Sequence, residues 1–280
     1  MGIPVWVILA VIGGLSSNLF NFLSRYVLRE KDDSTSWAWF YEVMRLPVFL
    51  IISFFDFKLT LTLYSAVLLV LVGITEWVSV YLYMKMHQYS HLSISTILSR
   101  TRLIWIPLIG FLFMKEQLEL FEYVGIVLLF AGVATTVAPH KLFVDKGAVY
   151  ANLAAIVIAV NVVLLKLVTP FASASVILFF YSLPAVLLFP LIMRNAKVRL
   201  LASARKQFPL KVIAMLASVV AGYFFIWALQ TGDVSKVNGI YQGMMATGVL
   251  AGIIFLKERE GIVRKIIGTA FAVIGVLMLV

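Results

Sequence analysis

Residues 110–116 read Gly-Phe-Leu-Phe-Met-Lys-Glu, and the pattern returns at residues 252–258 as Gly-Ile-Ile-Phe-Leu-Lys-Glu, an offset of 142 positions (252 − 110). Five further pairs keep this register, the last three after one inserted residue: Gln88 with Gln230, Ser93 with Ser235, Gly125 with Gly268, Gly132 with Gly275 and Val133 with Val276. A self-match of this kind, which here spans residues 81–133 and 223–276, predicts two related structural units. We place these units at residues 1–139 and 147–280.

The chain is too apolar for a soluble protein. Of its 280 residues, 62% are hydrophobic and 13% are charged, and the mean hydropathy is +1.04. Soluble domains have about 45–50% apolar and about 25% charged residues. A soluble enzyme is therefore excluded. The absence of Cys also excludes disulfides, thiolate metal sites and lipidated cysteines.

The apolar residues fall into blocks that match the roughly 20 residues a helix needs to cross about 30 Å of hydrocarbon. The alternating pattern of a membrane barrel is absent, so the spanning segments are expected to be helical. The sequence thus predicts an all-α integral membrane protein with ten transmembrane helices. The predicted spans are 3–22, 37–55, 61–83, 92–113, 121–137, 149–168, 175–193, 210–229, 234–256 and 262–280.

Each unit contains five predicted spans. Because five is odd, the second unit must enter the membrane with the opposite polarity to the first. Inverted repeats of this kind build many secondary transporters, whose substrate site lies between the two halves near the middle of the membrane.

Both units share one order of features. An aromatic-rich third helix is followed by a short polar turn, a fourth helix ending before Glu116 or Glu258, and a fifth helix with the pattern Gly-x6-Gly-Val. This order resembles the EamA domain of the drug/metabolite transporter superfamily, over the whole chain from Ile3 to Val280. The resemblance implies a central cavity lined by the first, third and fourth helices of each half. It implies a class of mechanism and not one substrate, because the superfamily carries amino acids, sugars, nucleotide sugars, phosphorylated metabolites and organic cations.

The glycines of the two fifth helices predict close helix packing. Gly125 and Gly132 are two helical turns apart, as are Gly268 and Gly275, so each pair lies on one helix face. Small residues at such spacing let two helices approach closely in lipid.

The basic residues predict the orientation of the chain. When every Lys and Arg except Arg45, Arg100 and Arg102 is assigned to its nearest helix end, sixteen fall in odd-numbered loops and four in even-numbered loops, namely Lys58, Lys115, Lys166 and Lys236. The positive-inside rule then places both chain ends outside a plasma or inner membrane. The net charge of +10 reflects orientation, and we expect no nucleic-acid partner.

Five ionisable residues lie within the predicted spans of the first half: Glu42, Arg45, Glu76, Arg100 and Arg102. At about 1.5 Å per residue they lie roughly 8–15 Å inside helix ends on the same side of the membrane, so we expect one layer of charges. One interpretation is a structural Glu-Arg network, because buried charges persist by pairing. The other is that an arginine binds an anionic group of the substrate while Glu42 or Glu76 exchanges a proton.

Polar and aromatic residues of both halves complete the predicted site. The first half supplies Asn18, Trp77, Tyr81 and Trp105, and the second half supplies Asn161, Tyr223, Trp227, Asn238, Tyr241 and Gln242. Aromatic walls with a few hydrogen-bonding groups are typical of a small-molecule site.

The sequence therefore predicts a secondary active or facilitative transporter of a small polar metabolite that works by alternating access. Anionic and zwitterionic compounds, such as an amino acid or a phosphorylated or carboxylated compound, are the candidate substrates, with protons as the candidate coupling ion and membrane lipids as partners. A flippase or lipid-linked carrier with the same fold is the alternative, followed by a non-transporting membrane module. No enzyme is expected, and no catalytic residue, metal or cofactor.

Overall fold

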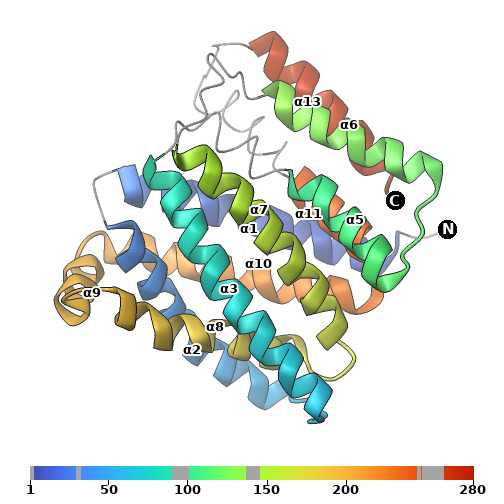
Figure 1. Ribbon diagram of the computed structural model, residues 1–280. Helices are drawn as coiled ribbons and strands as arrows, with labels where there is room; N and C mark the ends of the chain where they lie inside the picture. The colour runs from blue at the N-terminus through green and yellow to red at the C-terminus, as the bar shows by residue number, and fades with distance from the viewer. Residues whose placement is uncertain (1–2, 30–32, 90–100, 137–145, 245–246, 248–261) are drawn as a thin grey trace.

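The computed structural model describes residues 3–29, 33–89, 101–136, 146–244, 247 and 262–280. The described part is all-helical apart from one isolated bridge, Leu59 with Ala172, so the predicted fold class is confirmed at that level. Its helices are α1 (Val5–Arg29), α2 (Ser34–Asp56), α3 (Leu63–Tyr89), α5 (Arg102–Met114), α6 (Leu120–Thr136), α7 (Lys146–Val168), α8 (Ala174–Ile192), α9 (Ala196–Arg205), α10 (Phe208–Thr231), α11 (Val234–Gly243) and α13 (Ile262–Leu277) (Figure 1).

Six of these helices, α1, α2, α3, α7, α8 and α10, are long and apolar enough to cross a membrane. The predicted spans 92–113 and 234–256 are described only in part, as α5 and α11. The structure therefore supports a multi-pass membrane protein, whereas the count of ten stays a prediction.

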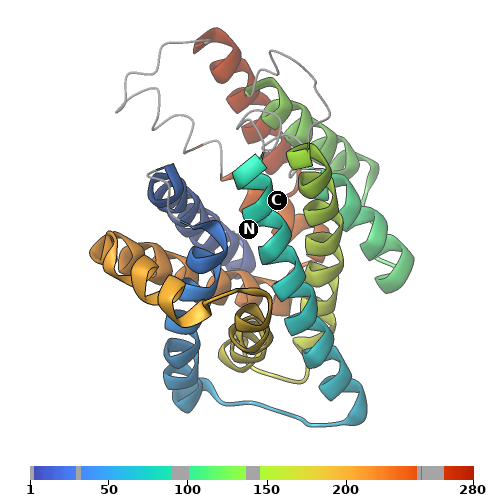
Figure 2. The ribbon, with the colours of Figure 1, turned by 60° about the vertical axis from the view of Figure 1, so that its left-hand side comes forward.

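The helices pack in pairs that reflect the repeat of the two halves. α1 packs on α10 and α7 packs on α3, so the first helix of each half lies against the third helix of the other. α2 packs on α8, and α5 on α11. α6 and α13 lie side by side, as Figures 1 and 2 both show. Equivalent helices of the two halves thus make equivalent contacts.

The helix bundle has two ends, which we name by their contents. The terminal face is the end at which α1 begins and α13 finishes, and Figure 1 shows the two chain termini close together there. Its short connections join α2 to α3 and α7 to α8, and they pair at the Leu59–Ala172 bridge. The basic face is the opposite end and carries α9.

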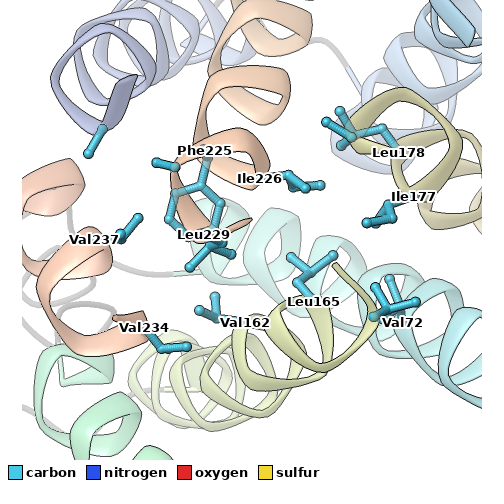
Figure 3. Packing of buried hydrophobic residues seen from close by; sticks show 14 of the residues in the cluster. Val72, Val162, Leu165, Ile177, Leu178, Phe225, Ile226, Leu229, Val234 and Val237 are labelled. Carbon is cyan, nitrogen blue, oxygen red and sulfur yellow. The ribbon is translucent and has the colours of Figure 1, made fainter. Parts of the chain in front are cut away.

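The core lies where the two halves meet. Figure 3 shows apolar side chains of α3, α7, α8, α10 and α11 converging, among them Val72, Leu165, Ile177, Phe225 and Val237. Large apolar side chains also face outward, including Phe54 at 79% and Leu191 at 78% exposure. This outer surface suits lipid, because in hydrocarbon an exposed Leu or Phe loses nothing.

Helix α9 corrects one sequence expectation, because residues 196–205 are predicted as part of a loop. Its mean hydropathy is too low and its length too short for a span, so a search for transmembrane blocks misses it. It packs on α2, where Arg199 pairs with Asp33, the N-cap of α2. Partial burial raises the pKa of Asp33, but hydrogen bonds from Ser36 and Arg199 outweigh it and hold this pKa below its usual range.

The glycine prediction is confirmed at the contact of α6 with α13. A Cβ added to Gly132 would lie 2.5 Å from the backbone nitrogen of Ala272 and 2.5 Å from the carbonyl oxygen of Gly268. Because both neighbours are backbone atoms, a side chain here forces the helices apart. We expect Gly132→Val to lower the free energy of unfolding by at least about 1–3 kcal/mol, measured by chemical unfolding in detergent. Val127→Leu, on the exposed face of the same helix, is the control and is expected to change little; equal effects of both variants would refute the close packing.

Candidate functional site

A central cavity of about 190 Å³ lies between the two halves. Its walls come from α1, α2, α3 and α5 of the first half and from α7, α8, α10 and α11 of the second. The second helix of each half, α2 and α8, thus adds to the lining that the resemblance implies. Seven residues predicted from sequence line it: Arg45, Glu76, Arg102, Asn161, Asn238, Tyr241 and Gln242.

Three of the five predicted charges meet in one buried triad. Arg45 donates from Nε to Glu42 Oε2 at 2.7 Å and from Nη2 to Glu42 Oε1 at 2.5 Å, because positions i and i+3 share a helix face. The same Nη2 lies 3.1 Å from Glu76 Oε1 on α3. Two carboxylates share one guanidinium, so the triad carries a formal charge of −1.

The triad is sealed from lipid, which explains how its charges persist. Glu42 is 0% exposed and does not line the cavity, whereas Arg45 and Glu76, each 5% exposed, do. Ser79 donates to the second oxygen of Glu76 at 3.0 Å, and the Arg45 guanidinium lies 4.9 Å from the centre of the Tyr41 ring. The structural interpretation therefore accounts for Glu42, while Glu76 also presents a carboxylate to the cavity.

Arg102 lines the same cavity as Arg45 and Glu76 but does not join the triad, and the single layer of five charges stays a prediction. It stands at the start of α5 and donates from Nη2 to Gln242 Oε1 on α11 at 2.7 Å. Its Nε is buried and has no hydrogen-bond partner, and no carboxylate pairs with it among the described residues. The cavity thus holds a guanidinium with unused donors. Arg100 lies outside the described residues.

The amide side chains of the cavity tie elements together. Asn161 on α7 donates to the carbonyl oxygen of Val72 at 3.0 Å and to Thr75 Oγ1 at 2.8 Å, both on α3. Gln242 lies one turn after Asn238, and its Nε2 is 3.5 Å from Asn238 Oδ1. Asn161 therefore joins the two halves directly, and Asn238 and Gln242 form a polar stripe on α11 beside Arg102.

Several predicted site residues lie elsewhere. Trp77 and Tyr81 line a second pocket, because the face of α3 that carries Glu76, Ser79 and Tyr83 to the central cavity turns them away from it. The others are placed as follows: Asn18 donates to the Met244 carbonyl, Trp105 packs against the core, Tyr223 donates to Asp56, and Trp227 is 43% exposed and stacked on Phe224.

The structure adds cavity residues that sequence reasoning missed: Ser17, Asn21, Tyr83, Tyr181 and Ser218. A signal existed for two of them, since Ser17 and Asn21 are one helical turn apart on α1 and share a face. Ser218 accepts from Arg45 Nη1 at 3.4 Å; it stands at the repeat position of Glu76, where the second half carries no charge.

Polar contacts between the halves close the terminal face. Lys115 ends α5 in a left-handed conformation, with φ 53°, and this turn sends Glu116 across to α11. Glu116 accepts from the backbone N–H of Ser235 at 3.1 Å and from its hydroxyl at 2.7 Å, at the N-terminus of α11. Glu122 pairs with Lys236 at 2.5 Å. In the first half, the glutamate of the repeated Lys-Glu pair thus accepts hydrogen bonds from the second half.

Burial raises the pKa of Glu116, although its bonds to Ser235 lower it. A raised pKa in the folded state means that this group's contribution to stability is greatest below its usual pKa and falls as pH rises through the folded value. We expect the melting temperature of the wild type, relative to Glu116→Gln, to fall as the pH rises above about pH 4, near the usual pKa of a glutamate. Glu119→Gln, on the same connection, is the matched control; a difference between wild type and Glu116→Gln that is flat with pH would contradict this account.

Comparisons with known proteins agree with this architecture. The model of the EamA-like transporter family matches residues 4–138 and again residues 145–280. A solved structure described only as "Crystal structure of protein" superposes with a TM-score of 0.66 at 15% identity, covering 96% of this chain and 97% of that one. At this identity the likeness shows the fold alone. No curated protein matches the sequence.

Proposed function

The chain belongs to the EamA-like transporter family, and from this premise we propose that it carries a small polar metabolite through the central cavity by alternating access. Members of this family are transporters, and we propose no catalytic role for any residue. The proposed working unit is a pair of inverted five-helix halves, residues 1–139 and 147–280. The exchange of equivalent helix contacts between the halves supports this arrangement.

One observation carries the proposal for the substrate: Arg102 lines the cavity with a buried Nε that has no partner among the residues the structure describes. A guanidinium with unused donors favours carboxylate or phosphate oxygens. The triad presents the opposite charge, through Glu76. We therefore propose an anionic or zwitterionic substrate, with Arg102 as the contact for its anionic group and Glu76 as the group that binds a cationic centre or exchanges a proton.

A thermal-shift panel with the purified protein in detergent tests this proposal. The panel holds small carboxylates, phosphorylated compounds and amino acids, with amines and neutral sugars of similar size as controls. We expect stabilisation by an anionic or zwitterionic compound, because a ligand that binds only the folded state raises its stability. Stabilisation confined to amines would overturn the assignment of Arg102.

We also propose that the protein resides in the plasma or inner membrane with both termini outside. The excess of Lys and Arg in the odd-numbered loops supports this orientation, and α9 and its basic residues then face the cytoplasm. A reporter that is active only in the cytoplasm, fused after Val280, is expected to be inactive. The same reporter inserted in the turn after Met193 is the control and is expected to be active; the reverse result would overturn the orientation.

A further inference from the structure

A second pocket, of about 410 Å³, opens at the basic face, apart from the central cavity. It lies between the ends of α3 and α8. These helices are in tight contact deeper in the bundle, where a Cβ added to Gly73 would lie 2.5 Å from Pro184 Cγ. Further towards the basic face, Trp77, Tyr81 and Lys85 line the pocket from α3. The two helices therefore form a wedge that widens towards the membrane surface.

The wedge is cationic at its mouth and apolar in its depth. Lys85 lies on the last turns of α3, with Nζ 5.7 Å from the centres of the Tyr81 and Tyr89 rings. Arg199 of α9 lines the same pocket; it pairs with Asp33, yet its side chain remains 36% exposed. The deeper wall is apolar, and it is formed by Val78 of α3 and by Ile192 and Met193 at the end of α8.

One hydrogen-bond donor inside this pocket has no acceptor among the described residues. The Nε1 of Trp77 is buried and has no partner among the described residues. A buried indole N–H without an acceptor is unfavourable, and interfacial tryptophans usually satisfy it with ester or headgroup oxygens. The pocket thus offers an unused donor about two helical turns below Lys85 at its cationic mouth.

Helix α9 places the mouth at headgroup depth. It exposes Val198 (69%) and Leu201 (50%) beside the exposed cations Arg194 and Lys197. Exposure of both apolar and basic side chains is typical of a helix at the membrane interface, and we place α9 there. Lys85 and Arg199, the cations at the mouth of the pocket, then lie at the level of the lipid phosphates.

We propose that this pocket binds one anionic phospholipid from the leaflet at the basic face. The phosphate is held by Lys85 and Arg199, an ester or headgroup oxygen accepts from Trp77 Nε1, and an acyl chain follows Val78 and Ile192. The apolar wall favours a lipid over free phosphate, because inorganic phosphate makes no use of it. This assignment stands independently of the transported substrate, since the pocket and the central cavity share no lining residue.

The test is a titration of the full chain in neutral detergent with phosphatidylglycerol, followed by thermal shift and by native mass spectrometry. We expect saturable stabilisation and retention of one phosphatidylglycerol. Phosphatidylcholine should bind more weakly, and inorganic phosphate should not reproduce the shift. Equal effects of the two lipids would overturn the anionic headgroup, and an equal effect of phosphate would overturn the lipid.

Variants locate the site. Lys85→Gln is expected to weaken phosphatidylglycerol binding about fivefold, the effect of one cation near lipid phosphate. Val78→Trp fills the apolar wall and should abolish retention of the lipid while the protein still melts cooperatively. Lys197→Gln is the matched control, an exposed cation of α9 outside the pocket, and should leave the affinity within about twofold. An effect of Lys197→Gln as large as that of Lys85→Gln would show a diffuse surface attraction and refute the pocket.

Discussion

Arg102→Gln is expected to remove most substrate transport while leaving the protein at least as stable as the wild type. Hydrogen bonds to charged groups contribute about 1.5–3 kcal/mol each, so loss of one such contact lowers kcat/KM about 10- to 150-fold. Stability should not fall, because no carboxylate pairs with Arg102 in the described structure and its Nε is buried without a partner. Removing a partly buried charge that no described carboxylate compensates costs the folded state little.

Loss of transport without loss of stability distinguishes a residue that contacts the substrate from a residue that holds the fold together. Arg264 supplies the matched control: within the described part of the chain its Nε is also buried without a partner, but it lies on α13, which does not line the central cavity. We expect Arg264→Gln to transport like the wild type, and Arg102→Lys to retain part of the activity because it keeps the charge without the fork of donors. Uptake into proteoliposomes and the melting temperature are measured for each variant. Full transport by Arg102→Gln would contradict the account.

Arg45→Met is expected to cause the largest loss of stability of any single substitution proposed here. It leaves Glu42 and Glu76 buried without their shared counter-ion. Breaking a buried ion pair by removing one partner destabilises by about 3–5 kcal/mol. The free energy of unfolding in detergent is the measurement.

A double-mutant cycle shows whether the triad acts as one unit. Glu42→Gln is the second substitution, because Glu42 pairs with Arg45 but does not line the central cavity. We expect Glu42→Gln to recover part of the stability that Arg45→Met loses, so the two effects are not additive. If Arg45→Met unfolds within about 1 kcal/mol of the wild type, or if the two effects simply add, the triad does not act as one unit.

Spacing along one helix, and depth from a helix end, were enough to predict that Glu42, Arg45 and Glu76 lie close together, but not that these three of the five charges form a triad. Glu42 and Arg45 share a helix face by spacing alone, and Glu76 was predicted at a similar depth from its own helix end. The spacing of Gly125 and Gly132 likewise predicted a close helix contact, although not that α13 is the partner, since both arguments need only 1.5 Å per residue and 3.6 residues per turn.

The pocket towards which each helix face points could not be predicted from the sequence. Trp77 is adjacent to Glu76 in the chain, yet the two line different pockets, because one residue turns the helix by about 100°. The side chain that meets Arg102, Gln242, is fixed only when α5 packs on α11. Helix α9 was missed because interfacial helices carry too little hydrophobicity for a search based on membrane thickness.

The central claim is that the cavity between the halves carries a solute across the membrane. Solute counterflow tests it most directly: proteoliposomes are loaded with the compound that stabilises the protein best, and entry of a labelled trace of the same compound is followed. Alternating access predicts transient accumulation of label above equilibrium, abolished in Arg102→Gln and retained in Arg264→Gln. Binding of the compound without accumulation above that in protein-free liposomes would contradict transport.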